Sequence, residues 1–396
     1  MVDAVIPLNQ NMMKKIYYIT AVFATLFLVG CGDGIDLPGV NVETDLNKIP
    51  LPDNNVNLEQ VELKPSTEPM LHEGLHTEED FQRIRGKKAA GEEPWVSAYQ
   101  LLVESQFSQK TADTYPTEWI KRGVSGDENY MNAARGATIA YQQALRWKIE
   151  QDDEYAAKAV ENLNKWVQTC VGVTGNTNLS LAAGLYGYEF AIAGELLRDY
   201  EGWDRADFTA FQNWLLKVFY PANDDFLKRH HDTNALHYWA NWCLCNIAAK
   251  MAIGIVTDRR DIYNEGIDHL QTGDTNGRLR RAIYHDYAPD YNFAQWQESG
   301  RDQGHTLMCV GLMGVICQLA WSQGDDFFAY DDNLFMRACE YAACCNYTNE
   351  TVPYTTYIWQ KQSQWGYPIP EEQTTLGGGK WIKRAIWRCL TIITKG

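Results

Sequence analysis

Several side chains that could bind an anion or move a proton lie close together in the segment QESGRDQGHT. This segment spans residues 297–306 and contains Glu298, Arg301, Asp302 and His305. Ser299 followed by Asp302 has the spacing of a capping box, which predicts a helix that starts near Gly300. Arg301 and His305 would then lie one turn apart on the same face, at the positive end of the helix dipole. The pattern favours an anion site, although Glu298 and Asp302 could instead neutralise Arg301 in a structural ion-pair cluster.

A second set of polar residues lies in HHDTNALHYWANWCLCN, residues 230–246. Asp232 or Thr233 can cap a helix here, and the apolar pattern predicts that the helix covers 234–256. Asn234, His237, Asn241 and Cys245 would form one stripe of this helix. Because polar groups on an apolar helix need partners or a cavity, the stripe is a candidate binding site. A histidine satisfied inside the core is the alternative.

Three tyrosines precede the first segment, in IYHDYAPDYNFAQW, residues 283–296. They are Tyr284, Tyr287 and Tyr291. A tyrosine near cationic groups can act as an acid or a base. The alternative, for at least two of them, is packing within a loop.

The elements that must position these residues are predicted to be helices throughout. Thr77 and Asp80 have capping-box spacing at the start of one helix. Apolar residues recur at helical spacing over 131–150, 155–171, 181–200, 205–219, 234–256, 258–271, 302–322 and 332–346. Short polar loops between them favour antiparallel pairs. A long series of such pairs predicts an all-α fold, an α/α toroid built as an incomplete barrel.

Composition narrows the class of protein. The 396 residues suffice for a large core, and 14 Trp and 22 Tyr suit both core packing and sugar binding. A net charge of −16 argues against a general nucleic-acid binder but permits a local basic cleft for a polyanion. The cysteines after Cys31 show no paired CxxC spacing, so we predict no metal site. Cys243, Cys245, Cys309 and Cys317 lie in apolar helical patterns and should act as small hydrophobes.

The two ends of the chain differ from the rest. Two lysines, a short apolar stretch and Leu28-Val29-Gly30-Cys31 resemble a lipoprotein signal, so residues 1–31 are predicted to direct export and Cys31 to carry lipid. Residues 32–69 are predicted to be a flexible tether, and 70–380 the catalytic domain. Residues 381–396 form an atypical tail: from Gly377 onward there are five basic residues and no acidic one, as a frameshift or truncation would explain.

Four segments together resemble the alginate-lyase-domain polysaccharide lyases of Bacteroidetes. They are HEGLHTEEDFQRIRGKKAAGEEPW (72–95), NALHYWANW (234–242), QESGRDQGHT (297–306) and EYAACCNYTNETVPY (340–354). The resemblance covers roughly residues 70–380. It implies an α/α toroid with a central cleft, no cofactor, and β-elimination of a uronate polysaccharide such as alginate, polymannuronate or a glucuronan-like chain.

The resemblance also implies roles for single residues. His237 matches the motif histidine and is the expected base or carboxylate partner, and Tyr291 is the expected catalytic tyrosine, with Tyr284 and Tyr287 as substitutes. The expected substrate-binding residues are Asn234, Asn241, Arg301 and His305. Relatives often have Asn immediately before the motif histidine, where this chain has Leu236, so Asn234 would have to take over that function. The implied setting is the periplasm or outer membrane of a Gram-negative bacterium, with the acidic polysaccharide and the membrane as partners and no nucleic acid.

Two other functions stay open at this point. A toroid glycoside hydrolase would need two carboxylates across a cleft, for which Glu298 and Asp302 are the candidates. A surface glycan-binding lipoprotein would explain the many aromatic residues, but it would leave the His–Asn stripe and the Arg–His turn without a purpose.

Overall fold

The computed structural model describes residues 67–347 and 351–379. The predicted signal, most of the predicted tether and the atypical tail, Cys31 included, lie outside these residues. The helices are α2 (Glu78–Ala89), α3 (Trp95–Glu104), η2 (Gln106–Ser108), α4 (Tyr130–Glu150), α5 (Asp153–Thr169), α6 (Leu179–Leu196), α7 (Arg205–Val218), α8 (Tyr220–Arg229), η3 (His230–Asp232), α9 (Ala240–Val256), α10 (Arg260–Thr272), α11 (Leu279–Ala282), α12 (Gln303–Ser322) and α13 (Tyr330–Tyr347). The strands are β1 (Trp119–Arg122), β2 (Gly172–Gly175), β3 (Ile283–Asp286), β4 (Ala294–Trp296), β5 (Tyr357–Gln362) and β6 (Pro368–Gln373).

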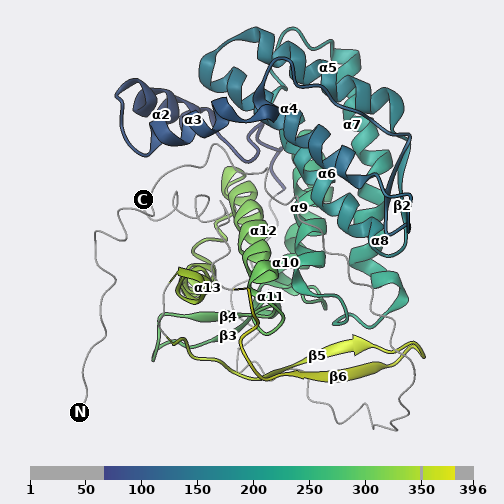
Figure 1. Ribbon diagram of the computed structural model, residues 1–396, viewed down its shortest axis with the longest axis vertical. Helices are drawn as coiled ribbons and strands as arrows, with labels where there is room; N and C mark the ends of the chain where they lie inside the picture. The colour runs from purple at the N-terminus through teal and green to yellow at the C-terminus, as the bar shows by residue number, and fades with distance from the viewer. Residues whose placement is uncertain (1–66, 348–350, 380–396) are drawn as a thin grey trace.

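The helices form an inner and an outer layer. In the inner layer α4 packs on α6, α6 on α9, and α9 on α12 (Figure 1). In the outer layer α5 lies against α4, α8 against α6 and α9, α10 against α9, and α13 against α12. Short turns join α4 to α5, α7 to α8 and α9 to α10, as the sequence predicted, whereas longer segments that contain strands lead into α4 and α12.

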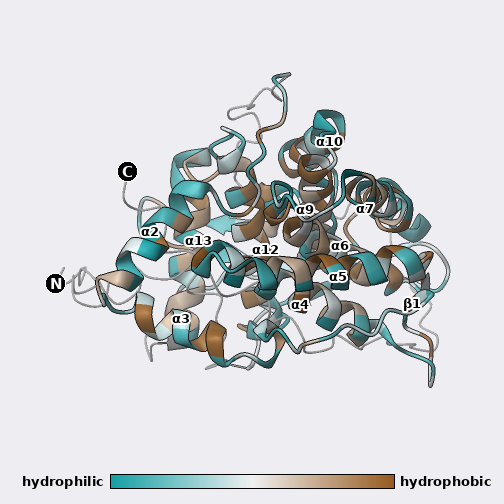
Figure 2. Ribbon diagram, turned by 90° about the horizontal axis from the view of Figure 1, so that it is seen from above, coloured by the Kyte–Doolittle hydropathy of each residue, from teal (hydrophilic) through white to brown (hydrophobic). Residues whose placement is uncertain are grey.

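Residue pattern explains which helix lies in which layer. The buried positions of α5 follow one face, from Tyr155 to Trp166 at helical spacing, and its other face is polar. Bands of hydrophilic and hydrophobic residues therefore alternate along α5 and α7 in Figure 2. By contrast α6, α9 and α12 are mostly apolar and almost wholly buried, so they have no solvent-facing polar side. Of the described helices, α12 is long and apolar enough to cross a membrane, but it is buried inside the protein.

Aromatic rings fill the space between the layers. Phe190 of α6 meets Trp214 of α7 edge-on at 5.1 Å, and Trp214 meets Phe219 in the same way at 5.1 Å. The predicted hydrophobic cysteines Cys243, Cys245, Cys309 and Cys317 are all buried thiols in this core. Among the described residues, no group of three or more His, Cys, Asp or Glu could hold a metal ion.

The strands form three two-stranded ribbons. β1 and β2 are parallel, with Trp119 opposite Gly172 and Arg122 opposite Gly175. β3 and β4 are antiparallel with a bulge, and β5 and β6 are antiparallel, with Trp359 opposite Glu371. The sequence analysis did not predict these ribbons, and two of them carry residues of the site described next.

Two predicted helix starts are wrong. α9 begins at Ala240 and not at residue 234, so the proposed stripe from Asn234 to Cys245 is broken and its first two members lie before the helix. α12 begins at Gln303, capped by Asp302, so Arg301 also lies before its helix. Ser299 is not a cap, because its buried Oγ has no hydrogen-bond partner among the described residues. The predicted capping box of Thr77 and Asp80 at α2 is confirmed.

Candidate active site

The N-terminus of α9 is capped by side chains from the segment before α12. The N-cap residue Trp239 provides no side-chain cap. Instead Gln297 Oε1 accepts the Ala240 N–H at 3.0 Å, and Glu298 Oε1 accepts the Asn241 N–H at 3.0 Å. Both are buried, so these bonds satisfy amides that water cannot reach. The polar residues of QESGRD thus join the starts of two inner helices.

Arg301 and His305 are held by carboxylates of the same segment. Arg301 Nη1 donates to Glu298 Oε2 at 3.2 Å. Asp302 caps α12 by accepting the His305 N–H at 2.8 Å, and its other oxygen lies 2.5 Å from His305 Nδ1. Burial acts to raise the Asp302 pKa, but the bonds from His305 and the nearby Arg301 outweigh it, so the pKa is lowered. Asp302 therefore stays ionised and orients His305.

A row of rings connects His237 to Arg301. The His237 ring stacks on Trp359 of β5, with centroids 6.0 Å apart. Trp359 stacks on Trp239 at 4.5 Å, and the Arg301 guanidinium lies over Trp239 at 5.3 Å. Lys361 of β5 adds a second cation, 5.9 Å from the Trp359 ring. We call these five half-buried residues the aromatic–cationic row.

The β5 strand fixes the protonation state of His237. The backbone N–H of Gln362 donates to His237 Nδ1 at 2.8 Å, and Trp359 Nε1 donates to the His237 carbonyl at 2.7 Å. Because Nδ1 accepts, the neutral ring carries its proton on Nε2. Burial, followed by the charge of Lys361, lowers the His237 pKa to about 4. Near neutral pH His237 is therefore a hydrogen-bond donor through Nε2.

The two candidate asparagines do not lie in the row. Asn234 Nδ2 donates to Gln362 Oε1 at 2.8 Å and to the Gln360 carbonyl at 3.2 Å, and its Oδ1 accepts the Leu236 N–H. It ties the segment before α9 to β5. Asn241 is fully buried, and its Nδ2 lies 3.5 Å from Met308 Sδ. Its Oδ1 has no partner among the described residues.

The three candidate tyrosines differ in access. Tyr284 is 5% exposed, and its hydroxyl donates to the Thr356 carbonyl at 3.3 Å. The Tyr287 hydroxyl lies 2.5 Å from Gln295 Oε1, and burial raises its pKa to about 12. Tyr291 is 54% exposed in the turn between β3 and β4, and its ring meets Tyr287 edge-on at 6.5 Å. Within the described residues, the ring contacts of Tyr291 do not extend to the aromatic–cationic row.

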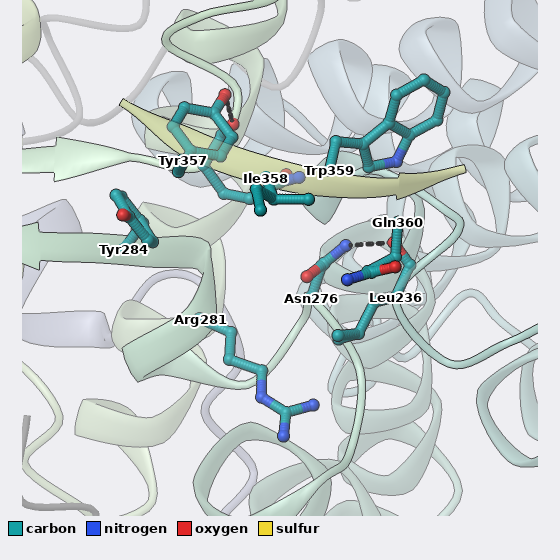
Figure 3. Close-up of a pocket in the computed structure, with 9 residues that line it drawn as sticks. Leu236, Asn276, Arg281, Tyr284, Tyr357, Ile358, Trp359 and Gln360 are labelled. Carbon is teal, nitrogen blue, oxygen red and sulfur yellow. Dashed lines mark hydrogen bonds between the residues drawn. The ribbon is translucent and has the colours of Figure 1, made fainter. Parts of the chain in front are cut away.

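A small pocket adjoins the row on the other side of β5. Figure 3 shows it between β5 and the segments that carry Tyr284, Arg281, Asn276 and Leu236. Trp359 belongs to both the pocket and the row. Asn276 Nδ2 donates to the carbonyls of Leu236 and Tyr238, at 2.9 Å each, and so supports the backbone around His237. The pocket is lined by Leu236, Asn276, Arg281, Tyr284, Gln297, Tyr357, Ile358, Trp359 and Gln360.

Comparison with known proteins decides the family. The sequence model described as alginate lyase matches residues 92–350, well over half of the chain. The chain belongs to the alginate lyase family. It is therefore a polysaccharide lyase, as the four motifs predicted. No match was found among proteins of curated function.

Solved structures show the fold of this family member. Alginate lyase A1-III from Sphingomonas species A1 has a TM-score of 0.50 at 13% identity, covering 70% of this chain and 79% of that one. A histidine-to-alanine variant of A1-III complexed with a tetrasaccharide has a TM-score of 0.51 at 14% identity, covering 73% and 85%. An alginate lyase from Bacteroides ovatus has a TM-score of 0.49 at 14% identity, covering 68% and 82%. The fold shared with the two A1-III structures is the α/α toroid, which confirms the predicted fold class.

Sequence reasoning missed several residues of the candidate site. Trp239, Trp359, Lys361 and Gln362 complete the surroundings of His237, and three of them come from β5. The β-branched and aromatic residues that open YIWQKQ could have indicated a strand. No local pattern indicated that this strand docks on a segment more than 120 positions earlier.

Proposed function

We propose that the chain cleaves a uronate-containing acidic polysaccharide, alginate (polymannuronate) or a glucuronan-like chain, by β-elimination at the aromatic–cationic row. The observation that supports this site is the continuous contact of His237, Trp359, Trp239 and Arg301. Flat rings can pack on sugar faces, while a guanidinium and an imidazole N–H beside them suit a carboxylate.

The carboxylate of the reacting sugar is held by Arg301 and by His237 Nε2–H. Neutralising this carboxylate makes the C5 proton acidic, because the developing negative charge spreads onto the carboxylate oxygens. In this proposal His237 is the carboxylate partner and not the base, since a backbone N–H occupies the Nδ1 lone pair. His305, oriented by Asp302, meets the ligand through Nε2 and helps to bind it.

The proton transfers are assigned to Tyr291. One group removes the C5 proton, the C4–O4 bond breaks as the C4–C5 double bond forms, and a proton is delivered to O4. The tyrosine that does this must reach the substrate. The exposed side chain of Tyr291 can do so, whereas the hydroxyls of Tyr284 and Tyr287 are bonded within the protein.

The charges of the QESGRD segment favour this assignment over hydrolysis. A hydrolase needs two carboxylates beside the scissile bond. Glu298 is fully buried and is bonded to Asn241 and Arg301, and Asp302 caps α12. Both carboxylates are thus engaged in holding helix starts and cationic side chains.

A panel of uronate polymers tests the proposal. The purified protein should release products with a C4–C5 double bond, seen as ultraviolet absorbance, from at least one of polymannuronate, polyguluronate and glucuronan. His237→Ala should lower kcat by roughly 10²–10³-fold, as loss of one preorganised donor does. The matched control His72→Ala, an exposed histidine far from the row, should keep the wild-type rate. Saturated products, or no products from any polymer, would contradict the proposal.

We also propose that the protein is exported and anchored by lipid on Cys31, in the periplasm or outer membrane. The support is the sequence Leu28-Val29-Gly30-Cys31 behind an apolar stretch. Cys31→Ser should move the protein from the membrane fraction to the soluble fraction. An unchanged distribution would mean that Cys31 is not the anchor.

A further inference from the structure

Arg122 is a buried arginine at the end of β1. Alternate residues of a strand face opposite sides, and Ile120 and Arg122 are the inward pair, with 0% and 5% exposure. Two glycines near Arg122, Gly123 and Gly175, allow β1 and the segment around β2 to approach each other closely. Gly175, opposite Arg122, has φ of +139°, and a Cβ there would collide with the Arg122 carbonyl. Gly123 has φ of +79°, and a Cβ there would collide with the Asn176 side chain. The ribbon is therefore shaped to hold Arg122 inside.

The Arg122 guanidinium has no counter-ion in the described part of the chain. Its Nη1 has no hydrogen-bond partner among the described residues. The Tyr130 ring lies 4.7 Å from the guanidinium and is stacked with Tyr186, whose centroid is 6.4 Å away. An unpaired buried charge is costly, and rings alone recover only part of that cost.

The neighbouring groups leave the site positively charged. Burial raises the pKa of Glu189 on α6 well above its usual range, which favours the uncharged form of this carboxyl. Burial also raises the pKa of the Tyr186 hydroxyl, against the effect of Arg122. Burial likewise raises the thiol pKa of Cys245 on α9, a further titratable neighbour. These shifts favour the uncharged forms of the groups, and no ion pair joins a carboxylate of the described residues to Arg122.

Packed residues link the site to the surroundings of His237. β2 ends at Gly175 and leads into α6, which begins at Leu179. Ser180 in the first turn of α6 lies 2.9 Å from His231 Nε2. The His231 ring contacts Tyr238 at 5.8 Å, and Tyr238 contacts His237 at 4.8 Å. A chain of contacts thus connects the β1–β2 ribbon with the aromatic–cationic row.

We infer that Arg122, with Tyr130 beside it, is a second carboxylate-binding site that holds a uronate of the polymer away from the cleavage point. The inference rests on the proposed function for the identity of the anion. The polymer carries a carboxylate on every uronate, so a chain bound at His237 and Arg301 offers further carboxylates to other cationic side chains. Arg122 then gains its counter-ion when substrate binds.

The first test is stability without ligand. Arg122→Met keeps the length of the stem and removes the unpaired charge, so its melting temperature should equal or exceed that of the wild type. The matched control is Lys121→Met on the same strand, which removes an equal charge that pairs with Asp127 at the surface and should change little. An Arg122→Met protein that melts far lower, or does not fold, would overturn the inference, because the guanidinium would then have a structural partner.

The second test is binding of mannuronate oligosaccharides by calorimetry, in a His237→Ala background in which cleavage is slow. Arg122→Met should weaken binding of long oligosaccharides roughly 10- to 100-fold, as loss of a charge-assisted pair does. Arg122→Lys should recover part of the loss, and Lys121→Met should bind as the background does. Neutral oligosaccharides should not show this dependence on Arg122. Equal affinity with and without Arg122 would overturn the inference, even if the wild type proves to be an active lyase. A loss confined to Arg122 variants would support it, even if no polymer is cleaved.

Discussion

Single residues of the candidate site could be selected from sequence, but the contacts that suggest their roles could not. His237 and Arg301 were candidates because of their motifs, and they lie in one row. The role of His237 depends on a backbone N–H of Gln362 that donates to its Nδ1. Such a contact between distant segments leaves no trace in local spacing, so base and carboxylate partner were equally compatible with the sequence.

The choice among the tyrosines gives the first prediction at this scale. Tyr291→Phe should lower kcat by ~10²–10⁴-fold and keep the melting temperature, because an exposed hydroxyl that transfers protons adds little to stability. Tyr284→Phe and Tyr287→Phe should keep most of the activity and lower stability by about 1 kcal/mol, since each loses a hydrogen bond inside the protein. Initial rates and urea unfolding of the three variants measure both effects. If Tyr291→Phe keeps full activity while one of the others loses it, the proton-transfer group is misassigned.

At the scale of elements, periodicity predicted most helices but misplaced the starts of α9 and α12. The N-terminus of α9 has no local cap because Gln297 and Glu298 supply it from a distant segment. The apolar pattern before α9 continues through Leu236 and Tyr238, so sequence alone extended the helix over a segment that is held outside it.

The cap of α12 gives a prediction that separates stability from function. Asp302→Ala should destabilise the protein by about 0.5–2 kcal/mol, because α12 loses its N-cap. Asp302→Asn should keep most of that stability, since asparagine also caps, but it removes the carboxylate beside His305. We therefore expect Asn at this position to raise KM while chemical denaturation stays near wild type. Equal activity of wild type and Asp302→Asn would mean that the carboxylate only caps the helix.

At the scale of the whole molecule, the layered helical fold could be predicted and the strands could not. In helices the hydrophobic periodicity repeats in every turn, and the mostly apolar sequences of α6, α9 and α12 indicate an inner layer. The ribbons are short, so they leave little pattern in the sequence. The close packing of Gly123 and Gly175 around Arg122 can be recognised only when β2 is placed beside β1. The candidate site therefore depends on contacts between distant segments, which local sequence patterns do not reveal.

The last prediction concerns the pH dependence of global stability. Burial lowers the pKa of His76 to about 4, despite the opposing charge of Asp80. As the pH falls from about 6.5 toward 4, the unfolded chain binds a proton at this histidine and the folded chain does not, so stability falls. Burial raises the pKa of Glu195 to about 7, so the folded chain binds a proton there before the unfolded chain does, and this increases stability as the pH falls. The pH dependence of wild-type stability therefore contains both contributions.

Substitution isolates the contribution of His76. His76→Phe keeps ring packing against Tyr141 and Phe81, and removes the titration. The loss of the 2.5 Å contact with the Tyr141 hydroxyl should lower stability at every pH. Between pH ~4.5 and ~6, however, the unfolding free energy of the variant should fall less steeply with acid than that of the wild type, by roughly 1.4 kcal/mol per pH unit. Urea unfolding at a series of pH values measures the two slopes, and half-exposed His72→Phe is the control. Parallel slopes for wild type and His76→Phe would show that His76 titrates alike in the folded and unfolded chains.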